Sequence, residues 1–332
     1  MQAILKKLLR SENLDSAESR RAMTAIMTGE AGEARTAAFL TALAIKGETG
    51  VEIAACAKAM RKAAEKWPGP DYETLLDTCG TGGDGANTIN ISTLAAIVLA
   101  SLGLPVAKHG NRAVSSTSGS ADLLEALGLP LNLSHTEVVQ KLEKSKLAFL
   151  FAPHWHPAMK YAVPVRKALG YRTVFNILGP LTNPAPVTHQ VMGVYDKQLL
   201  GTIAEAMCGL GRQAAVVLHS ADGLDEVSPA AATFIVRVNG NHCEAVTEIT
   251  PTDFGFEIMD RSKLVIQNRD EGLARTRHIL AGEGNAVENR TIAMNAALLY
   301  QLVASEKNLA EAAAVCLAQI ESGKLLEFVQ TW

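Results

Sequence analysis

Aromatic side chains and an excess of positive charge are both scarce in this sequence. Phenylalanine, tryptophan and tyrosine make up 5% of the 332 residues, which is little for a surface that stacks the bases of single-stranded nucleic acid. Lysine and arginine number 31 against 34 aspartate and glutamate residues, for a net charge of -3. The chain has no global basic field for non-specific binding to nucleic acid or anionic lipid, although composition leaves a local basic groove open. We expect neither nucleic acid nor membrane as a partner.

Paired cysteines and long apolar runs are missing too. The five cysteines are odd in number and never spaced as Cys-x-x-Cys, which is typical of reduced packing thiols rather than of a disulfide framework or a zinc site. The most apolar stretch, residues 94–107, contains serine, glycine and proline and is too short to span a bilayer. The first residues carry Lys6 and Lys7 among apolar ones, unlike a signal peptide. We therefore expect a cytoplasmic protein.

Helix-forming residues dominate the first fifth of the chain. Residues 1–66 are rich in Ala, Leu, Glu, Lys and Met, and apolar residues recur at intervals of three and four residues, the spacing of one helix face. The cluster Trp67-Pro68-Gly69-Pro70 breaks this pattern and marks a candidate boundary. The sequence predicts a small all-helical domain over residues 1–70, completed by a second helical stretch at about residues 157–183.

After the breaker, apolar strand-like runs alternate with helical segments. Alternation of this kind predicts a mainly parallel central sheet. The fold class is therefore α/β, with a larger α/β domain over residues 71–332. The predicted strands are 74–79, 106–108, 148–151, 190–195, 214–219 and 233–238, and the predicted helices of this part are 92–102, 121–127, 197–209, 270–281 and 286–304.

A glycine-rich segment follows the first predicted strand. Residues 77–85 read DTCGTGGDG and lead through NTINIST into a helix. A dinucleotide-binding loop would open its helix directly after the glycines and place an acid about 20 residues later, whereas here the next strand ends at Lys108. A bend that feeds amides and hydroxyls onto a helix start binds phosphate through backbone N–H groups. A tight strand-to-helix turn is the purely structural alternative.

Two further segments bear charge. Residues 108–122 read KHGNRAVSSTSGSAD, so that two cations precede a run of hydroxyls, as in an anion-binding loop; a flexible serine-rich linker is the alternative. Residues 222–226 read DGLDE. Adjacent carboxylates in a turn suit Mg²⁺, which commonly uses one or two carboxylates plus substrate phosphates, but a solvated acidic turn has the same sequence.

The stretch from 154 to 183 is basic and contains two histidines. His154 and His156 have the spacing of metal ligands, but no third ligand is evident nearby and packing is the simpler interpretation. Arg166 is either a surface cation or a residue whose planar guanidinium binds a carboxylate through two hydrogen bonds. No motif of a covalent nucleophile or clear general base appears, so we name no catalytic residue. The composite predicts a transferase that acts on a phosphorylated, Mg²⁺-bound sugar.

At these segments the chain resembles the anthranilate phosphoribosyltransferases of tryptophan biosynthesis. GTGGDG with NTINIST, KHGNRAVSS with SGSAD, HPAMKYAVPVRKALGYRTVFNILGPLTNP and DGLDE occur in the family's order over nearly the whole length. The resemblance implies a small helical domain joined to an α/β domain, in a fold shared with pyrimidine nucleoside phosphorylases, usually as a homodimer. It also implies the transfer of a phosphoribosyl group from phosphoribosyl pyrophosphate to anthranilate, with Mg²⁺ as the cofactor.

The resemblance also implies, position by position, three sets of site residues. Mg²⁺ ligands would be Ser92, Asp225 and Glu226. Anthranilate would contact Gly80, Asn111 and Arg166, with His109 lining its pocket. The phosphoribosyl pyrophosphate site would comprise Gly80, Gly83, Asp84, Thr88, Asn90, Ile91, Ser92, Thr93, Lys108, His109, Gly110, Asn111, Arg112, Ala113, Val114, Ser115, Ser116 and Ser120.

Two other functions stay open at this point. A pyrimidine nucleoside phosphorylase would share the fold and a similar glycine loop, but should lack the Asp225-Glu226 pair and the region around Arg166. A catalytically silent relative that binds nucleic acid should have lost the metal carboxylates and gained a basic surface. This chain keeps both acids and is net acidic.

Overall fold

The structure is a computed structural model that describes residues 1–112 and 119–332. Four predicted site residues, Ala113, Val114, Ser115 and Ser116, lie outside the described residues.

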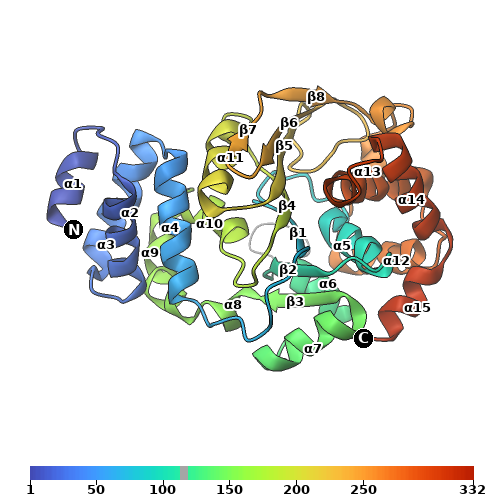
Figure 1. Cartoon of the computed structure of the whole chain (residues 1–332), viewed down its shortest axis with the longest axis horizontal. Coiled ribbons are helices and arrows are strands. Elements are labelled where there is room, and N and C mark those ends of the chain that lie inside the picture. Colours follow the sequence, from blue (N-terminus) through green and yellow to red (C-terminus); the bar gives the residue numbers. More distant parts are fainter. Residues whose placement is uncertain (113–118) are drawn as a thin grey trace.

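Four helices from the first 63 residues form a block at one end of the molecule (Figure 1). Asp15 and Thr49 accept hydrogen bonds from the amides of Glu18 and Glu52, whose side chains bond back, so α2 and α4 both begin with a capping box. The block encloses an apolar core that includes Phe39, which is fully buried. Its helices are α1 (Gln2–Leu8), α2 (Ser16–Met27), α3 (Gly32–Lys46) and α4 (Gly50–Ala63).

A later part of the chain returns to this block. Its elements are α8 (Ala152–Trp155), the 3-10 helix η1 (Pro157–Tyr161), α9 (Val163–Leu169) and α10 (Phe175–Leu181). Val165 and Leu178 are buried in the same apolar cluster as Phe39, and α9 ends at Gly170 in the left-handed conformation. The predicted second helical stretch is therefore present as short helices packed on the first block.

A twisted sheet occupies the middle of the molecule (Figure 1). Its strands are β1 (Leu76–Gly80), β2 (Val106–Gly110), β3 (Leu147–Phe151), β4 (His189–Gly193), β5 (Ala214–Ser220), β6 (Thr233–Asn239), β7 (His242–Cys243) and β8 (Thr247–Ile249). The order is β3-β2-β1-β4-β5-β6-β7, with β8 also paired to β6; β1 to β5 are parallel and β6 to β8 antiparallel. The strand order reverses between β1 and β4, and ligands of open α/β sheets bind at the carboxyl ends of such neighbours.

Helices cover both faces of the sheet. They are α5 (Ile91–Ser101), α6 (Ser120–Ala126), α7 (His135–Ser145), α11 (Leu199–Leu210), α12 (Arg269–Leu280), α13 (Ala286–Val303), α14 (Leu309–Glu321) and α15 (Lys324–Gln330), with short 3-10 turns η2 (Pro251–Phe254) and η3 (Arg261–Leu264). The cluster that contains α5 and α13 packs on one face, and the cluster that contains α11 and α4 packs on the other. In the described residues no helix is long and apolar enough to cross a membrane.

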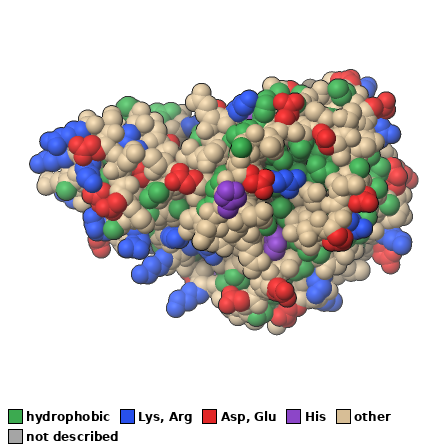
Figure 2. All heavy atoms as spheres, turned by 45° about the horizontal axis from the view of Figure 1, so that its top comes forward, with side chains coloured by type: hydrophobic (Ala, Val, Ile, Leu, Met, Phe, Trp, Pro, Cys, Tyr) green, Lys and Arg blue, Asp and Glu red, His purple; other side chains and the backbone are tan. Residues whose placement is uncertain are grey.

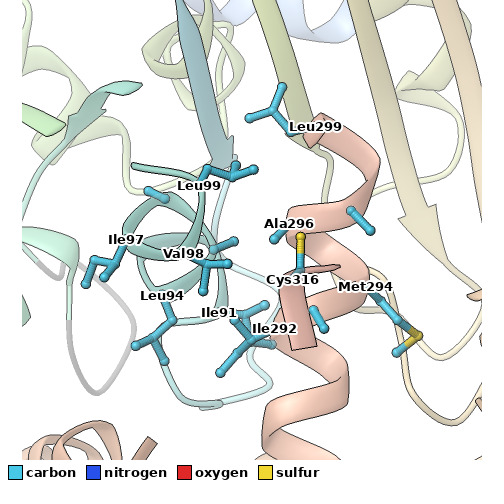
Figure 3. Close-up of a cluster of buried hydrophobic side chains, with 14 of the residues drawn as sticks. Ile91, Leu94, Ile97, Val98, Leu99, Ile292, Met294, Ala296, Leu299 and Cys316 are labelled. Carbon is cyan, nitrogen blue, oxygen red and sulfur yellow. The ribbon is translucent and has the colours of Figure 1, made fainter. Parts of the chain in front are cut away.

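Helix α5 is apolar on every side. Leu94 and Val98 point into the cluster shown in Figure 3, where Ile292 and Ala296 of α13 and Cys316 of α14 meet them. Each fully buried aliphatic side chain of this size contributes about 1.5–3 kcal/mol. The helix is therefore held firmly, and so is its first turn, which lies at the candidate site.

The predicted strands and helices agree with the observed ones to within a few residues at each end. The predicted strand at 190–195 runs from His189 to Gly193, and the predicted helix at 92–102 runs from Ile91 to Ser101. Helices α7, α14 and α15 and the short strands β7 and β8 are not among the predicted elements. They lie at the edges of the sheet or on the outside of its helical layers (Figure 1).

Candidate active site

The glycine loop follows β1 and is bent by three residues in the left-handed region. Gly82, Gly83 and Gly85 have φ of 65°, 79° and 72°, which side chains other than glycine rarely adopt. Thr81 fixes the loop to β4, because its amide donates to the carbonyl of Gly193 at 2.9 Å and its hydroxyl accepts from the amide of Tyr195 at 3.0 Å. These two hydrogen bonds hold the loop at the carboxyl end of β4.

The acidic turn after β5 docks onto this loop. The amide of Gly82 donates to Oδ2 of Asp225 at 2.7 Å. A Cβ atom on Gly80 would strike the Asp225 carboxylate, and one on Gly193 would strike the Asp225 backbone carbonyl. Glycine at the ends of β1 and β4 therefore leaves the room in which Asp225 sits.

The second acid of the turn, Glu226, lies at the first turn of α5. Burial and the charge of Asp225 raise the pKa of Glu226, whereas Lys108 and the backbone amide of Ser92 lower it. A carboxylate at a helix N-terminus faces unpaired N–H groups and the positive end of the helix dipole. Asn90 precedes the helix, Ile91 and Thr93 are buried in its first turn, and Thr88 bridges to Val265.

Three carboxylates gather here. Burial raises the pKa of Asp225, and the charge of Asp84 raises it further. In the described ranges no three His, Cys, Asp or Glu side chains are arranged to hold a metal ion by themselves. The set nevertheless fits Mg²⁺, which usually keeps waters and substrate phosphates alongside one or two protein carboxylates. The mutual repulsion of these acids is the property that a bound cation relieves.

Lys108 lies beside the acids, on β2. Its side chain is buried, and Nζ donates to the carbonyl of Thr78 at 2.6 Å and to Oγ of Ser92 at 3.2 Å. An ammonium has three donors, so these contacts leave one for a ligand. Through these hydrogen bonds, the ammonium of Lys108 on β2 is tied to β1 and to the start of α5.

Arg112, the other predicted phosphate cation, is engaged elsewhere. Its guanidinium donates to both carboxylate oxygens of Glu125 at 2.7 and 3.0 Å and to Asp122 at 3.0 Å. These acids raise the pKa of Arg112 and belong to α6. Its charge is thus already compensated by the helix that follows the loop.

Asn111 closes the base of the same loop. Its carbonyl accepts from the amide of Ala121 at 3.2 Å and from Oγ of Ser120 at 3.4 Å. Gly110 permits this closure, because a Cβ there would strike Oγ of Ser120 and the ring of Phe149. Asn111 itself is exposed at the sheet edge.

Two neutral histidines lie behind the loop. His109 is buried, its Nδ1 lies 3.2 Å from the carbonyl of Gly179, and its ring centroid lies 5.1 Å from that of His156. Burial lowers the pKa of His109 to about 3, with a contribution from His156, and burial lowers the pKa of His156 to about 4. His154 is exposed against Phe151, and among the described residues neither His154 nor His156 belongs to a group of three potential metal ligands.

Arg166 extends from α9, in the helical block. Its guanidinium lies 5.3 Å from the centroid of the Phe175 ring, and burial lowers its pKa. Residues 1–112 and 119–332 contain no carboxylate within ion-pair distance of it. A half-buried cation beside an aromatic ring suits a small aromatic anion.

Arg172 is a residue that the sequence interpretation missed. It lies between α9 and α10, donates from Nη2 to the carbonyl of Gly83 at 2.6 Å, and has Cζ 3.8 Å from the centroid of the Tyr195 ring. It ties the helical segment to the glycine loop. The only sequence signal is the basic texture of the segment, which does not separate Arg172 from Lys160 or Lys167.

Comparison with known proteins agrees with this geometry. Residues 2–64 match the model of the helical bundle domain of the glycosyl transferase family, and residues 72–326 match the model of its a/b domain. Anthranilate phosphoribosyltransferases of Shouchella clausii and Aeromonas salmonicida are 40% and 44% identical to the chain, over 100% and 97% of it and 96% and 95% of their own lengths.

Solved structures give the same result. An anthranilate phosphoribosyltransferase of Thermus thermophilus superposes with a TM-score of 0.92 at 39% identity, over 99% of this chain and 97% of that one. The Saccharomyces cerevisiae enzyme, in complex with PRPP and Mg, superposes with 0.89 at 30% identity, over 99% and 95%. The fold is that of a glycosyl transferase that combines a helical bundle with an α/β domain. Within that class, the chain belongs to the anthranilate phosphoribosyltransferase family.

The predicted family, fold class and enzyme class are therefore confirmed, and neither the phosphorylase nor the silent nucleic-acid-binding alternative is favoured. The individual site residues and the domain limits stay predictions. The structure brings together Gly80, Gly83, Asp84, Ser92, Lys108, Asp225 and Glu226, while Arg112 is turned toward α6.

Proposed function

We propose that the chain transfers the phosphoribosyl group of phosphoribosyl pyrophosphate to the amine of anthranilate, giving N-(5-phosphoribosyl)anthranilate and pyrophosphate. The observation that supports this most is the meeting of the glycine loop, the acidic turn and Lys108 at the carboxyl edge of the sheet. Such an edge offers backbone amides, one buried cation and paired carboxylates, which together match a metal-bound pyrophosphate.

The donor side of the reaction needs stabilised negative charge. Pyrophosphate leaves C1 of the ribose while positive charge develops on the sugar, so donors fixed before the reaction act where charge appears. Lys108 and the amides of the glycine loop are such donors, and hydrogen bonds to the flanking segments hold them in place. Ser92, Asp225 and Glu226 would hold Mg²⁺, which when bound neutralises charge on the departing pyrophosphate.

The acceptor side needs orientation rather than a strong base. The ammonium formed when an aromatic amine attacks is acidic and loses its proton readily, so we assign no general base. Arg166 would bind the anthranilate carboxylate, with Asn111, Gly80 and the neutral ring of His109 around it. Holding the amine in line with C1 supplies much of the acceleration.

The helical block has a second role in this proposal. It would comprise residues 1–70, completed by helices from about residues 157–183, and the α/β domain would span residues 71–332 apart from that stretch. Six of the eight large apolar side chains that are exposed in the described residues belong to the helical block: Leu9, Ile45, Val51, Tyr161, Val163 and Tyr171. Apolar surface left exposed favours an interface where it is contiguous, and we propose that a second copy of the chain covers this block, as a homodimer.

We further propose a cytoplasmic enzyme with small-molecule substrates. Its five cysteines carry free thiols, as expected in a reducing compartment. On the face shown in Figure 2, acidic side chains are interspersed with basic ones, which favours small substrates over nucleic acid.

One assay tests the reaction. Purified protein is mixed with anthranilate and phosphoribosyl pyrophosphate, with and without Mg²⁺, and the loss of anthranilate fluorescence is followed. We expect loss only when all three components are present. Phosphorolysis of a pyrimidine nucleoside without any consumption of anthranilate would establish the phosphorylase alternative instead.

A further inference from the structure

A buried polar network lies directly beneath the candidate site. Its centre is Asp77 of β1, which is 0% exposed. Asn183 donates from Nδ2 to Oδ2 of Asp77 at 3.0 Å, Gln190 does so from Nε2 at 3.4 Å, and the amide of His109 donates more weakly to Oδ1 at 3.5 Å. A buried carboxylate is costly unless it is paired and hydrogen-bonded, so a network of this kind calls for a reason.

The network ties the end of α10 and the residues that follow it to three strands. Nδ2 of Asn183 donates to the carbonyl of Ala107 on β2 at 2.8 Å as well as to Asp77. Gln190 of β4 donates to the carbonyl of Pro180 at 2.7 Å. With the contact between His109 and Gly179, residues 179–183 are held at three points on β1, β2 and β4.

The positive charges of Lys108 and Arg212 oppose the negative charge of the Asp77 carboxylate. Arg212, 2% exposed, donates from Nε to Oε1 of Gln190 at 3.0 Å and from Nη1 to the carbonyl of Val187 at 2.6 Å. Burial raises the pKa of Asp77 to about 6, against the opposing charges of Lys108 and Arg212. Asp77 thus stands between a cation at the candidate donor site and one at the far end of the network.

The position of this network suggests a role beyond stability. Residues 179–183 continue the segment that bears Arg166, the proposed acceptor residue, and Arg172, which contacts the glycine loop, while β1 and β2 bear the glycine loop and Lys108 of the donor side. We infer that Asp77 is a positioning residue that, through Asn183, sets the acceptor-bearing segment in register with the donor strands. This inference rests on the proposed function.

Asp77→Asn tests it by exchanging one acceptor oxygen for a donor. The new amide cannot accept from both Asn183 and the amide of His109, so the segment shifts relative to β1. Because in-line attack depends on alignment, we expect kcat to fall about tenfold or more, with each KM changing less than about threefold. A residue with a purely structural role would lower the melting temperature and leave kcat of the folded fraction unchanged.

Glu52→Gln is the matched control. It makes the same carboxylate-to-amide change at a buried acid of α4, which caps that helix and pairs with Lys46 outside the network around Asp77. We expect a lower melting temperature and an unchanged kcat, measured well below the transition. A kcat loss in both variants that follows their loss of stability, or an unchanged kcat in Asp77→Asn, would overturn the inference.

Asn183→Ala provides the test from the other end of the bond if Asp77→Asn does not fold. It changes no charge and should lower kcat in the same way; an unchanged kcat again overturns the inference. The two levels of hypothesis fail differently. A wild-type protein that never consumes anthranilate refutes the proposed function, whereas an active wild type with an equally active Asp77→Asn variant refutes only the role of Asp77.

Discussion

Oδ2 of Asp225 accepts a hydrogen bond of 2.7 Å from the backbone amide of Gly82, 143 residues earlier in the chain. The acidic turn and the glycine loop are therefore one unit, because the carboxylate that would bind a cation also fixes the bend that would bind phosphate. Glycine at positions 80 and 193 makes this contact possible by leaving space for the turn. Substitutions at either segment should consequently affect both ligands.

Replacing the acid pair should remove activity without lowering the stability of the fold. Burial raises the pKa of Asp225 and of Glu226, which means that their ionised forms destabilise the folded state above the usual carboxyl pKa. We expect Asp225→Asn with Glu226→Gln to lose most Mg²⁺-dependent turnover, a loss of several kcal/mol of charge stabilisation, and to melt at pH 8 no lower than the wild type. The side-chain amide that replaces the Asp225 carboxylate still offers an oxygen to the amide of Gly82. Near-normal turnover at ordinary Mg²⁺ concentration would refute the metal assignment.

The donor site is tested by Lys108→Ala. Loss of a charge-assisted contact of about 1.5–3 kcal/mol should raise the KM for phosphoribosyl pyrophosphate by roughly tenfold or more. Gly83→Val should impair the same binding, because φ of 79° is strained for valine and its Cβ lies 3.3 Å from Nη2 of Arg172. Lys144→Ala, an exposed lysine of α7, is the control. If calorimetry shows that Lys108→Ala and Gly83→Val bind phosphoribosyl pyrophosphate with unchanged affinity, this loop is not the phosphate site.

The acceptor site is tested by Arg166→Ala. We expect the KM for anthranilate to rise far more than the KM for phosphoribosyl pyrophosphate, because the guanidinium is placed for the carboxylate of the acceptor. Loss of ground-state binding raises KM with kcat little changed, whereas a misoriented amine lowers kcat as well. Arg166→Lys should rescue only in part, since an ammonium lacks the planar fork. Equal rises in the two KM values would place Arg166 on the donor side.

Arg172→Gln should loosen the glycine loop. The variant loses the charge-assisted bond to the Gly83 carbonyl and the stacking on Tyr195, and an exposed contact of this kind contributes about 1 kcal/mol. We expect the KM for phosphoribosyl pyrophosphate to rise a few-fold while the melting temperature stays close to that of the wild type. Lys167→Ala, an exposed cation on the neighbouring helix, controls for charge. If both variants behave alike, the contact with Gly83 has no role in donor binding.

His156 makes stability depend on pH. Its pKa falls from 6.5 to about 4 through burial, so between these values the unfolded state binds more protons. Stability is therefore fully present above pH 6.5 and declines as pH falls toward 4, by up to about 3 kcal/mol. His156→Asn should reduce the pH dependence of the denaturant-measured stability between about pH 7.5 and 5 and leave the part that buried His109 contributes, whereas the exposed neighbour variant His154→Asn should keep the wild-type slope. A slope that is the same in all three proteins would contradict the buried, neutral state of His156.

Local patterns were enough to predict much of the candidate site. The glycines of residues 80–85 predicted a phosphate loop because few residues other than glycine adopt such a bend, and adjacent acids at 225 and 226 predicted a hard-cation site. Both interpretations rest on properties of neighbouring residues. Arg112 shows their limit. Its position beside Lys108 suggested a second phosphate cation, but Glu125 lies one helix further on and pairs with it.

Asp77 and Arg172 show what a linear pattern does not contain. Nothing next to Asp77 reveals that Asn183 and Gln190 will meet it, since these partners are more than one hundred residues away. Arg172 resembles every other cation of its basic segment until the fold places it on Gly83.

The sequence by itself determined the alternation of helices and strands, the glycine bend, the acid pair and the family, because hydrophobic periodicity, backbone freedom and motif order are local properties. The tertiary structure alone decided which charges face one another. Parallel strands bring their carboxyl ends to one edge, and the order β2-β1-β4-β5 set Lys108, Gly82 and Asp225 side by side. Burial at that edge then raised the pKa of Asp225 and of Glu226, since the cost of a charge depends on solvent access and on neighbours that only the folded chain provides.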